Sequence, residues 1–519
     1  MSLLHLLAIA AALFLAAVMF AVWSYGRFAK RSAGAPSHAI APPDNPCTEL
    51  DLAVAGLAEE HDGATGLAMV AGNLDAFAVR ALSAREAGRS LDLMYYYWKD
   101  DLTGRLLARE VIAAADRGVH VRLLLDDINA SGKDRAYQSL DAHPNIAVRL
   151  FNPSRARDPG LRRGIEMVLR AFRVNRRMHN KAWIADGRLA IVGGRNIGDA
   201  YFGASDGSNF RDVDVALIGP AVAEAVSVFD AFWNSELTMP IRALARLRKA
   251  RLGRIRKSLR KLAASEAARR CVEAMAERPS LTDLLRDQLG IDWTQSVKVL
   301  SDPPDKAVGL GESRWLARTI RSVIASADSR LSITSPYFIP GPEGVSGLTA
   351  LVAAGADVAV LTNSLAATDV AAVHGGYAPY RKALLEAGVR LFELQPYRRG
   401  KEMSLLGSRG ASLHTKSFTV DHHTGFVGSF NFDPRSMSLN TEMGVLFVQP
   451  DLVARLTALF ERETRPDFSY ELALAENGAL SWREEDRGRT VVHRHEPEAS
   501  RTRRAVAAIV TWLPIQSQL

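Results

Sequence analysis

Two stretches of the chain repeat one pattern of reactive side chains at the same spacing. The first, HNKAWIADGRLAIVGGRN, begins at His179, and the second, HTKSFTVDHHTGFVGSFN, begins at His414. In both, a lysine follows the histidine by two residues, an aspartate by seven and an asparagine by seventeen. Two histidines on equivalent parts of a duplicated fold can meet, so that one attacks a substrate while the other transfers protons. The repeat therefore predicts an enzyme active site.

Each stretch is predicted to form a strand, a turn and a returning strand. Apolar residues alternate after each histidine, and Asp186-Gly187 is a strong hairpin signal in the first copy. Residues two apart on a strand share a face, so each histidine and its lysine point the same way. Each returning strand then brings a small residue, Gly194 or Ser429, where backbone amides can approach an anion closely.

Such a pocket suits a phosphodiester, because its cations and amides can hold the non-bridging oxygens while the imidazoles act on phosphorus and the departing alcohol. A metal site is disfavoured, since lysine is not an ordinary ligand and neither copy has the ligand set of a zinc or iron site. The motif aspartates lie at predicted strand ends, which favours a structural role for them over a chemical one. The candidate catalytic residues are His179, Lys181, Asp186, Asn196, His414, Lys416, Asp421 and Asn431, with Gly194 and Ser429 as candidates for phosphate binding.

These paired motifs resemble the HKD signature of the phospholipase D superfamily. The resemblance implies a covalent phosphohistidine intermediate without metal or cofactor, and it covers most of residues 85–465 because the flanking segments repeat as well. Ser90–Asp127 and Ser329–Asn363 each predict a strand, an amphipathic helix ending at a glycine and a second strand. The expected fold class is α/β, with two mixed-sheet halves packed with pseudo-two-fold symmetry and an N-terminal transmembrane helix.

The resemblance also implies an acidic residue after each motif that accepts a hydrogen bond from the catalytic imidazole and fixes its tautomer. Asp212 and Glu442 are the candidates for this imidazole-orienting role, and Asp214 competes because the spacing does not exclude it. Family precedent makes His179 the expected nucleophile and His414 the expected general acid and then base. The two copies are too similar for the sequence itself to decide between them.

Other segments are similar to bacterial cardiolipin synthases, most closely to their C type: Leu150–Pro153, GGRNIGDAYFG from Gly193, and the C-terminal WLPIQSQL. This similarity implies transfer of a phosphatidyl group from a donor phospholipid, phosphatidylethanolamine for the C type, to the free hydroxyl of phosphatidylglycerol. Hydrolysis of phospholipid to phosphatidic acid and a nuclease of the same fold are the enzymatic alternatives. A non-catalytic membrane scaffold is disfavoured by two intact motifs.

The N-terminus predicts a membrane anchor. Leu3–Trp23 is an almost unbroken apolar run, interrupted by His5, and at ~1.5 Å per residue it is about long enough to cross a bilayer. The basic residues within 27–31 follow this run, which favours an uncleaved anchor in a bacterial inner membrane with the catalytic part in the cytoplasm. An export signal cleaved near 33–35, with a periplasmic enzyme, is the alternative.

Three basic segments could contact phospholipid. Arg242–Leu262 holds ten Lys and Arg and no acid, which fits a helix on an anionic bilayer and a solvated inter-domain helix equally well. The C-terminal segment from Arg501 predicts membrane docking or a cap on the second half. Eight arginines from Arg155 to Arg177 favour phosphate head groups over nucleic acid, because an anchor would separate the enzyme from nucleic acid. In the first segment, the apolar residues with near-helical spacing are Leu244, Leu247, Leu252, Ile255, Leu259 and Leu262.

A chain of 519 residues, 48% hydrophobic and 24% charged, is globular and long enough for two domains. Its two cysteines give no disulfide framework. The expected partners are phospholipids and a membrane, without nucleic acid, and the sequence identifies no protein partner. The predicted divisions are an anchor or signal segment (1–26), a linker (27–60), a first half (61–240), a basic helical inter-domain segment (241–295), a second half (296–470) and a C-terminal segment with a basic amphipathic helix (471–519).

Overall fold

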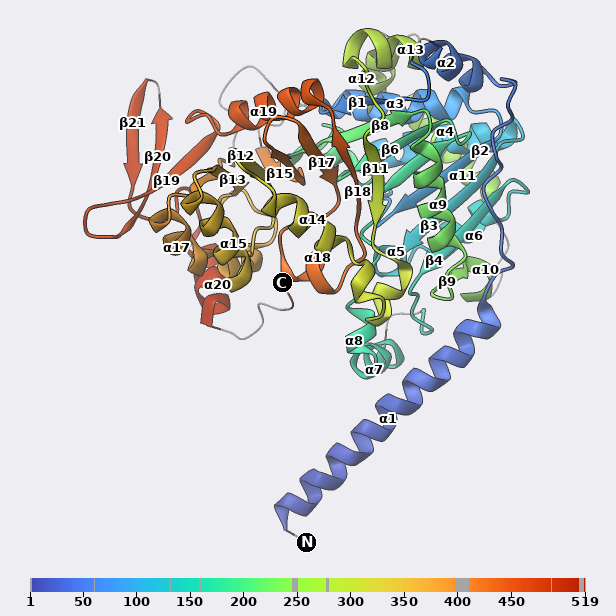
Figure 1. Cartoon of the computed structure of the whole chain (residues 1–519). Helices are drawn as coiled ribbons and strands as arrows, with labels where there is room; N and C mark the ends of the chain where they lie inside the picture. Colours follow the sequence, from blue (N-terminus) through green and yellow to red (C-terminus); the bar gives the residue numbers. More distant parts are fainter. Residues whose placement is uncertain are drawn as a thin grey trace.

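The computed structural model contains two large sheets side by side, each flanked by helices (Figure 1). It describes residues 2–512 and 518, except for residues 60, 131, 158–159, 245–250, 277–279, 397–409 and 487. Eight strands follow one another in the same spatial order in both sheets, which confirms the predicted duplicated α/β fold.

The first half is a nine-stranded mixed sheet. Its strands are β1 Thr65–Val70, β2 Ser90–Tyr95, β3 His120–Asp126, β4 Ile146–Phe151, β5 Ala182–Ala185, β6 Leu189–Gly193, β8 Asp214–Ile218, β9 Thr238–Pro240 and β10 Asp292–Thr294. They lie in the order β10-β1-β8-β6-β5-β2-β3-β4-β9, with β2, β3 and β4 parallel. The strand β10 adds part of the predicted inter-domain segment to this sheet.

The second half is a ten-stranded mixed sheet. Its strands are β11 Val297–Ser301, β12 Arg330–Thr334, β13 Asp357–Asn363, β14 Arg390–Leu394, β16 Ser417–Val420, β17 Thr424–Gly428, β18 Met443–Val448, β19 Ser469–Leu474, β20 Leu480–Asp486 and β21 Arg489–His493. They lie in the order β11-β18-β17-β16-β12-β13-β14-β19-β20-β21, with β12, β13 and β14 parallel. The last three strands extend this sheet into the predicted C-terminal segment.

A shared apolar core and a small third sheet join the halves. Val192 and Val215 of the first half belong to the same buried cluster as Val427 and Val445 of the second. The third sheet is the parallel pair of β7 (Ser208–Arg211) and β15 (Gly410–Leu413). Because β7 precedes Asp212 and β15 precedes His414, this pairing connects the two halves directly at the predicted site.

Helices cover both faces of each sheet, which explains why the central strands are almost continuously apolar. The first half has α2 Glu49–Ala58, α3 Asn73–Glu86, α4 Leu102–Asp116, α5 Asp127–Ala130, α6 Asp134–Asp141, α7 Leu161–Leu169, α8 Ala171–Val174 and α9 Val222–Trp233. The segment between the halves has α10 Ile241–Leu244, α11 Leu252–Ala263, α12 Glu266–Ala276 and α13 Leu281–Asp283. The second half has α14 Leu316–Ala325, α15 Gly341–Ala353, α16 Ala371–Tyr377, α17 Arg381–Glu386, α18 Pro434–Ser438, α19 Pro450–Glu463 and α20 Arg501–Trp512.

The N-terminal helix α1, Leu3–Ser32, projects from the body (Figure 1) and is long and apolar enough to cross a membrane. Its last turns are part of the fold, because Tyr25 is buried and donates a hydrogen bond to the Pro153 carbonyl at 2.7 Å. The segment that follows crosses the first half in extended form. There, Arg149 donates to the Ala35 carbonyl at 2.6 Å.

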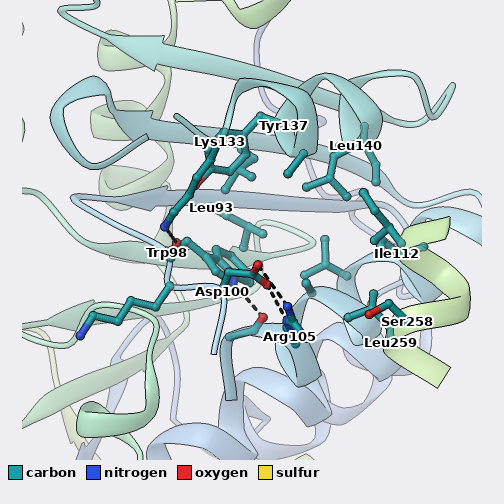
Figure 2. Close-up of a pocket in the computed structure, with 18 of the residues that line it drawn as sticks. Leu93, Trp98, Asp100, Arg105, Ile112, Lys133, Tyr137, Leu140, Ser258 and Leu259 are labelled. Atoms are coloured by element: carbon teal, nitrogen blue, oxygen red, sulfur yellow. Dashed lines mark hydrogen bonds and ion pairs between the residues drawn. The ribbon is translucent and has the colours of Figure 1, made fainter. Parts of the chain in front are cut away.

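The basic helix α11 turns its apolar face into the protein. Leu259 is buried, and Ile255 packs against the same core. Both line an apolar cavity of about 420 Å³ against α4 and α6, which Figure 2 shows together with the ion pair of Asp100 and Arg105. This packing favours the solvated inter-domain helix over a helix with its apolar face in a bilayer. Leu247 lies outside the described residues.

The C-terminal helix α20 packs on α16 of the second half, where Ala507 and Val510 are buried. Its other face is exposed at Val506, Ile509 and Trp512. The helix therefore caps the second half, as one of the two interpretations of this segment predicts.

Candidate active site

Backbone contacts with the opposite half fix both motif histidines. The amide of His179 donates to the Thr441 carbonyl at 2.9 Å, and the amide of His414 donates to the Arg211 carbonyl at 2.8 Å. Thr441 and Arg211 each lie directly before a predicted imidazole-orienting acid. Each histidine is therefore held beside the acid of the other half.

Glu442 of the second half binds His179 of the first. The Nδ1 atom of His179 lies 2.8 Å from Oε2 and 3.1 Å from Oε1 of Glu442, so Nδ1–H donates to the carboxylate and Nε2 is left to react. Ser429 and Ser436 donate to the same carboxylate at 2.5 and 2.9 Å. Although burial opposes ionisation, His179, Lys181 and the Ser429 hydroxyl hold the pKa of Glu442 below its ordinary value.

Asp212 of the first half binds His414 of the second in the same way, with 2.6 Å between Oδ2 and Nδ1. The competing candidate, Asp214, is turned away and forms a buried ion pair with Arg80 at 2.8 Å. Arg80 also binds the Tyr95 hydroxyl, so Asp214 belongs to the core of the first half. The residues that lie on the imidazoles are thus Asp212 and Glu442.

The two lysines are almost fully buried beside the histidines. Lys181 and Lys416 each donate to the carbonyl of the histidine two residues earlier. Burial lowers the pKa of Lys181 to about 7 and that of Lys416 to about 8, despite the nearby carboxylates. A bound phosphodiester would add negative charge beside the lysines and so favour their protonated forms.

The imidazoles themselves are held neutral. Burial lowers the pKa of His179, with a smaller effect from Lys181 and Lys416, and it lowers the pKa of His414 further. The charge of His179 contributes to the shift of His414. The motif side chains of both halves therefore act on one another electrostatically within a single site, and a neutral imidazole is the form that can attack phosphorus.

The motif asparagines lie at the same site in different environments. Asn196 donates to the Tyr201 hydroxyl at 3.2 Å, and that hydroxyl lies 3.4 Å from Nε2 of His414. Asn431 is buried, and its side-chain oxygen has no hydrogen-bond partner within the described part of the chain. A buried amide of this kind is suited to a ligand contact.

Gly194 and Ser429 lie against the two acids. A Cβ atom on Gly194 would be 2.4 Å from Oδ1 of Asp212, so only glycine fits beside this carboxylate. Ser429 donates its amide to the Met443 carbonyl at 2.8 Å and its hydroxyl to Glu442. Phosphate binding by these two residues stays a prediction, and it requires Ser429 to exchange one of these partners for the ligand.

The motif aspartates lie at the far ends of their strands from the histidines. Asp186 accepts hydrogen bonds from the amides of Gly88, Arg89 and Ser90 and from the Thr48 hydroxyl. Asp421 similarly accepts from the three amides of 328–330. These bonds place both aspartates at equivalent turns, outside the group of side chains that surrounds the imidazoles.

The arginine cluster before the first motif is largely bound to the protein itself. Arg157 pairs with Asp127 and Asp134, and Arg177 pairs with Asp126. Arg170 and Arg176 also bind groups of the protein. These four arginines position the chain that leads into His179. Arg155 and Arg163 contact the protein as well, at the Ser24 hydroxyl and the Arg157 carbonyl, so head-group contacts of this cluster stay a prediction.

Several site residues were not predicted from the sequence. The ring of Tyr96 packs edge to face against His179, with centroids 5.2 Å apart, and Tyr201 packs in the same manner against His414 at 5.0 Å. Tyr96 directly follows β2 in the repeated segment Ser90–Asp127, and Tyr201 lies in the stretch from Gly193 that resembles cardiolipin synthases, so both stood in segments that the sequence analysis had already selected. Ser436 gave no such signal, because only the fold brings it to Glu442.

A cluster of His374, Glu393 and Glu496 is the group of described residues with the spacing of metal ligands. Arg381 donates hydrogen bonds to Glu393 at 3.2 Å and to Glu496 at 2.7 Å, and its positive charge balances theirs. The cluster lies in the second half beside α16 and is separate from the motif residues. Its geometry is that of an internal ion-pair network.

Comparison with known proteins places this site in a family. Residues 83–233 and 320–464 match the family model described as "Cardiolipin synthase, PLD-like domain". The chain is 39% identical over 477 residues to cardiolipin synthase C of Escherichia coli (strain K12), covering 90% of this chain and 99% of that protein. It is 30% identical over 441 residues to an uncharacterized protein of Helicobacter pylori (strain ATCC 700392 / 26695), covering 84% of this chain and 83% of that protein.

Among solved structures, the phosphatidylserine synthase of Haemophilus influenzae Rd KW20 has a similar fold. It superposes with a TM-score of 0.54 and 16% sequence identity, over 90% of this chain and 100% of that one. At this identity the likeness shows the fold alone. It supports the duplicated arrangement of the two sheets.

Proposed function

This chain belongs to the phospholipase D superfamily, in its cardiolipin synthase family, and we propose that it makes cardiolipin by transferring a phosphatidyl group between phospholipids. The observation that carries the proposal is the crossed pairing of His179 with Glu442 and of His414 with Asp212. It presents two imidazoles, each bound at Nδ1 by a carboxylate of the opposite half, beside two buried lysines. The similarity to cardiolipin synthase C over nearly its whole length gives the substrate class.

In the proposed first step, Nε2 of His179 attacks the phosphorus of the donor phospholipid, phosphatidylethanolamine. A P–N bond forms and the P–O bond to ethanolamine breaks. The leaving oxygen receives a proton from Nε2 of His414, which is an imidazolium in the substrate complex because the bound anionic phosphodiester favours that form. Lys181 and Lys416 hold the non-bridging oxygens through both steps.

In the second step, the terminal hydroxyl of phosphatidylglycerol attacks the phosphohistidine. His414 takes the proton of this hydroxyl, the P–N bond breaks, and cardiolipin leaves. Water is the competing acceptor and would give phosphatidic acid. Asn196 and Asn431 complete the set of polar groups around the phosphoryl group in this proposal.

The proposed location is a membrane, with α1 as a retained anchor. The buried Tyr25 and the bond from Arg149 to the Ala35 carbonyl support retention, because cleavage near 33–35 would remove contacts that the first half uses. The basic residues after the apolar run support a cytoplasmic catalytic part.

The test is reconstitution of the purified full chain in vesicles of phosphatidylethanolamine and phosphatidylglycerol with separately labelled head groups. Transfer from phosphatidylethanolamine predicts cardiolipin together with free ethanolamine. Cardiolipin with free glycerol instead would make phosphatidylglycerol the donor, and phosphatidic acid without cardiolipin would replace transfer by hydrolysis. His414→Ala is the control for contaminating activity.

A further inference from the structure

Helix α7 carries an exposed apolar stripe on the surface of the first half. Leu161, Ile165 and Val168 are 81%, 49% and 61% exposed, respectively. They are four and three residues apart, so they lie on one side of the helix. A helix at the surface of a globular domain normally turns such a stripe toward the core.

The polar side of α7 faces the protein and is fixed there. Glu166 accepts hydrogen bonds from the amides of Arg155 and Ala156 at 2.8 and 2.7 Å. It also forms an ion pair with Arg170 at 2.7 Å. These contacts hold the stripe outward, because turning it inward would break all of them.

The stripe lies next to the candidate membrane span. Helix α7 contacts α1, and Figure 1 shows it on the side of the body from which α1 projects. The guanidinium of Arg170 lies over the Tyr25 ring, 3.3 Å from its centroid, and so links the end of α7 to α1. The apolar stripe is therefore carried by a helix that contacts α1, whose candidate membrane-spanning part is not buried in the protein.

The charge around α7 complements an anionic surface. Residues 160–177 contain six arginines and one glutamate. Arg170 and Arg177 form ion pairs with Glu166 and Asp126, and the net charge of the segment together with these partners stays positive. An amphipathic helix with a basic surround binds in the interface of anionic bilayers, with its apolar side among the acyl chains. The bilayer is thus the partner whose chemistry fits both the stripe and its surroundings.

The segment after α7 leads directly to the catalytic histidine. Asn152 donates to the carbonyls of Arg173 and Arg176, both at 2.9 Å, and so ties α8 to the end of β4. A cavity of about 670 Å³ lies between Met167 of α7 and this segment, with Leu439 of the second half on its other side. His179 follows three residues after Arg176.

We propose that α7 lies in the head-group region of an anionic bilayer, with Leu161, Ile165 and Val168 among the acyl chains. In this position the helix holds the approach to His179 at the lipid surface. The inference rests on the proposed function, because only a substrate embedded in a bilayer requires that the approach to His179 lie at the lipid surface. Arg242–Leu262 was one candidate for a helix on the bilayer, and the inference gives that membrane contact to α7 instead.

The test uses an environment-sensitive fluorophore on a single exposed cysteine of the full chain, in a Cys47→Ser background. The label at Ile165→Cys should be quenched by a lipid-borne quencher in vesicles of phosphatidylethanolamine and phosphatidylglycerol. The matched control is Val492→Cys on β21, which is also exposed, at 55%, and lies at the far end of the second half (Figure 1). The control label should remain unquenched.

A second measurement tests the consequence for activity. Replacing Leu161, Ile165 and Val168 by serine together should lower cardiolipin formation in vesicles by about tenfold relative to turnover of a soluble phosphodiester. Leu310→Ser, at a residue 60% exposed in the second half, is the control and should leave this ratio unchanged.

An unquenched label at position 165 in vesicle-bound protein would overturn the inference, and so would a label shielded from both water and lipid, which would indicate a protein partner. The quenching measurement does not require turnover. Quenching at 165 without cardiolipin formation would therefore contradict the proposed function while leaving the membrane contact of α7 intact.

Discussion

Each motif imidazole of this chain lies against an acid from the opposite half. Glu442 lies on His179 and Asp212 lies on His414, and in both cases a backbone contact between the halves brings the pair together. Neither half holds a complete catalytic unit. The site therefore depends on the register between the halves as much as on the motifs themselves.

The crossed pairing predicts which acid acts in which step. With a p-nitrophenyl phosphodiester, whose leaving group needs no proton, His414→Ala and Asp212→Asn should still release nitrophenol in a single turnover. His179→Ala and Glu442→Gln should lose this step, by about 10²- to 10⁴-fold for the glutamine variant, because the nucleophile loses its orienting acceptor. Rapid-quench kinetics with both substrate types measures the difference.

The opposite pattern, with release surviving in the His179 and Glu442 variants, would exchange the roles of the two histidines. Equal loss in all four variants would argue against separate nucleophile and acid roles. Asp214→Asn is less suitable as a control, since it removes a buried ion-pair partner of Arg80. The exposed Asp100→Asn is the better one.

The pKa values of the buried lysines predict a pH profile. As pH rises through 7 to 8, Lys181 and Lys416 lose the protons that hold the phosphate, so kcat/KM should fall on the alkaline side. The acidic limb should lie below 6.5, because the pKa of His179 is lowered and its neutral, attacking form persists to lower pH. Lys416→Arg should move the alkaline fall of kcat/KM to higher pH, because arginine keeps its proton. If the residual activity of this variant fell at the same pH as that of the parent, deprotonation of Lys416 would not cause the fall.

For the individual residues, the sequence predicted which side chains lie in one pocket. It did not predict which acid pairs with which histidine. The repeat placed the histidines, lysines and asparagines in one pocket because strand periodicity and the duplication require it. The pairing across the halves depends on β7 meeting β15 and on Thr441 meeting His179, which are contacts between segments about 200 residues or more apart. Spacing within one motif carries no information on such contacts.

At the scale of the elements, the motif aspartates stabilise turns at strand ends by accepting hydrogen bonds from backbone amides. Asp186→Ala should lower the free energy of unfolding by about 2–4 kcal/mol, because three backbone amides and the Thr48 hydroxyl lose their acceptor. The rate per folded molecule should stay within a few-fold of the parent. Denaturation with urea, alongside turnover of a soluble diester, measures both quantities.

His179→Ala is the matched comparison for Asp186→Ala, since it should abolish turnover and leave stability nearly unchanged. If Asp186→Ala abolished turnover at unchanged stability, the aspartate would be part of the chemistry, as its place in the motif first allowed.

Helix α11 shows that amphipathic periodicity alone does not tell whether an apolar helix face contacts the bilayer or the protein core. Its basic face is outward and its apolar residues cover α4 and the cavity in Figure 2, whereas α7 has the reverse orientation. Leu259→Ala should therefore destabilise the first half by about 2–4 kcal/mol, and Lys257→Ala on the exposed face should have little effect. Equal thermal unfolding midpoints for the two variants would contradict this packing.

At the scale of the whole molecule, the N-terminal segment joins the apolar helix α1 to the first half. Tyr25 contacts the loop after β4, Arg149 holds the Ala35 carbonyl, and Thr48 reaches the motif residue Asp186. The apolar run predicted the anchor, but the extended segment after it has no periodicity that would predict such contacts. Helix α1 is therefore continuous with the first half through these contacts.

This continuity predicts different results for replacing and deleting the anchor. An unrelated transmembrane sequence in place of Leu3–Trp23 should preserve cardiolipin formation, because the contacts that begin at Tyr25 remain and the chain stays at the bilayer. Deleting Leu3–Trp23 should instead shift the products toward phosphatidic acid. A phosphohistidine away from a lipid surface meets water more often than phosphatidylglycerol, and transfer requires that the acceptor alcohol be close and water scarce. The ratio of cardiolipin to phosphatidic acid, measured with labelled phospholipid at matched total turnover, tests this. An unchanged ratio after deletion would mean that the pocket selects the alcohol by itself, without help from the membrane.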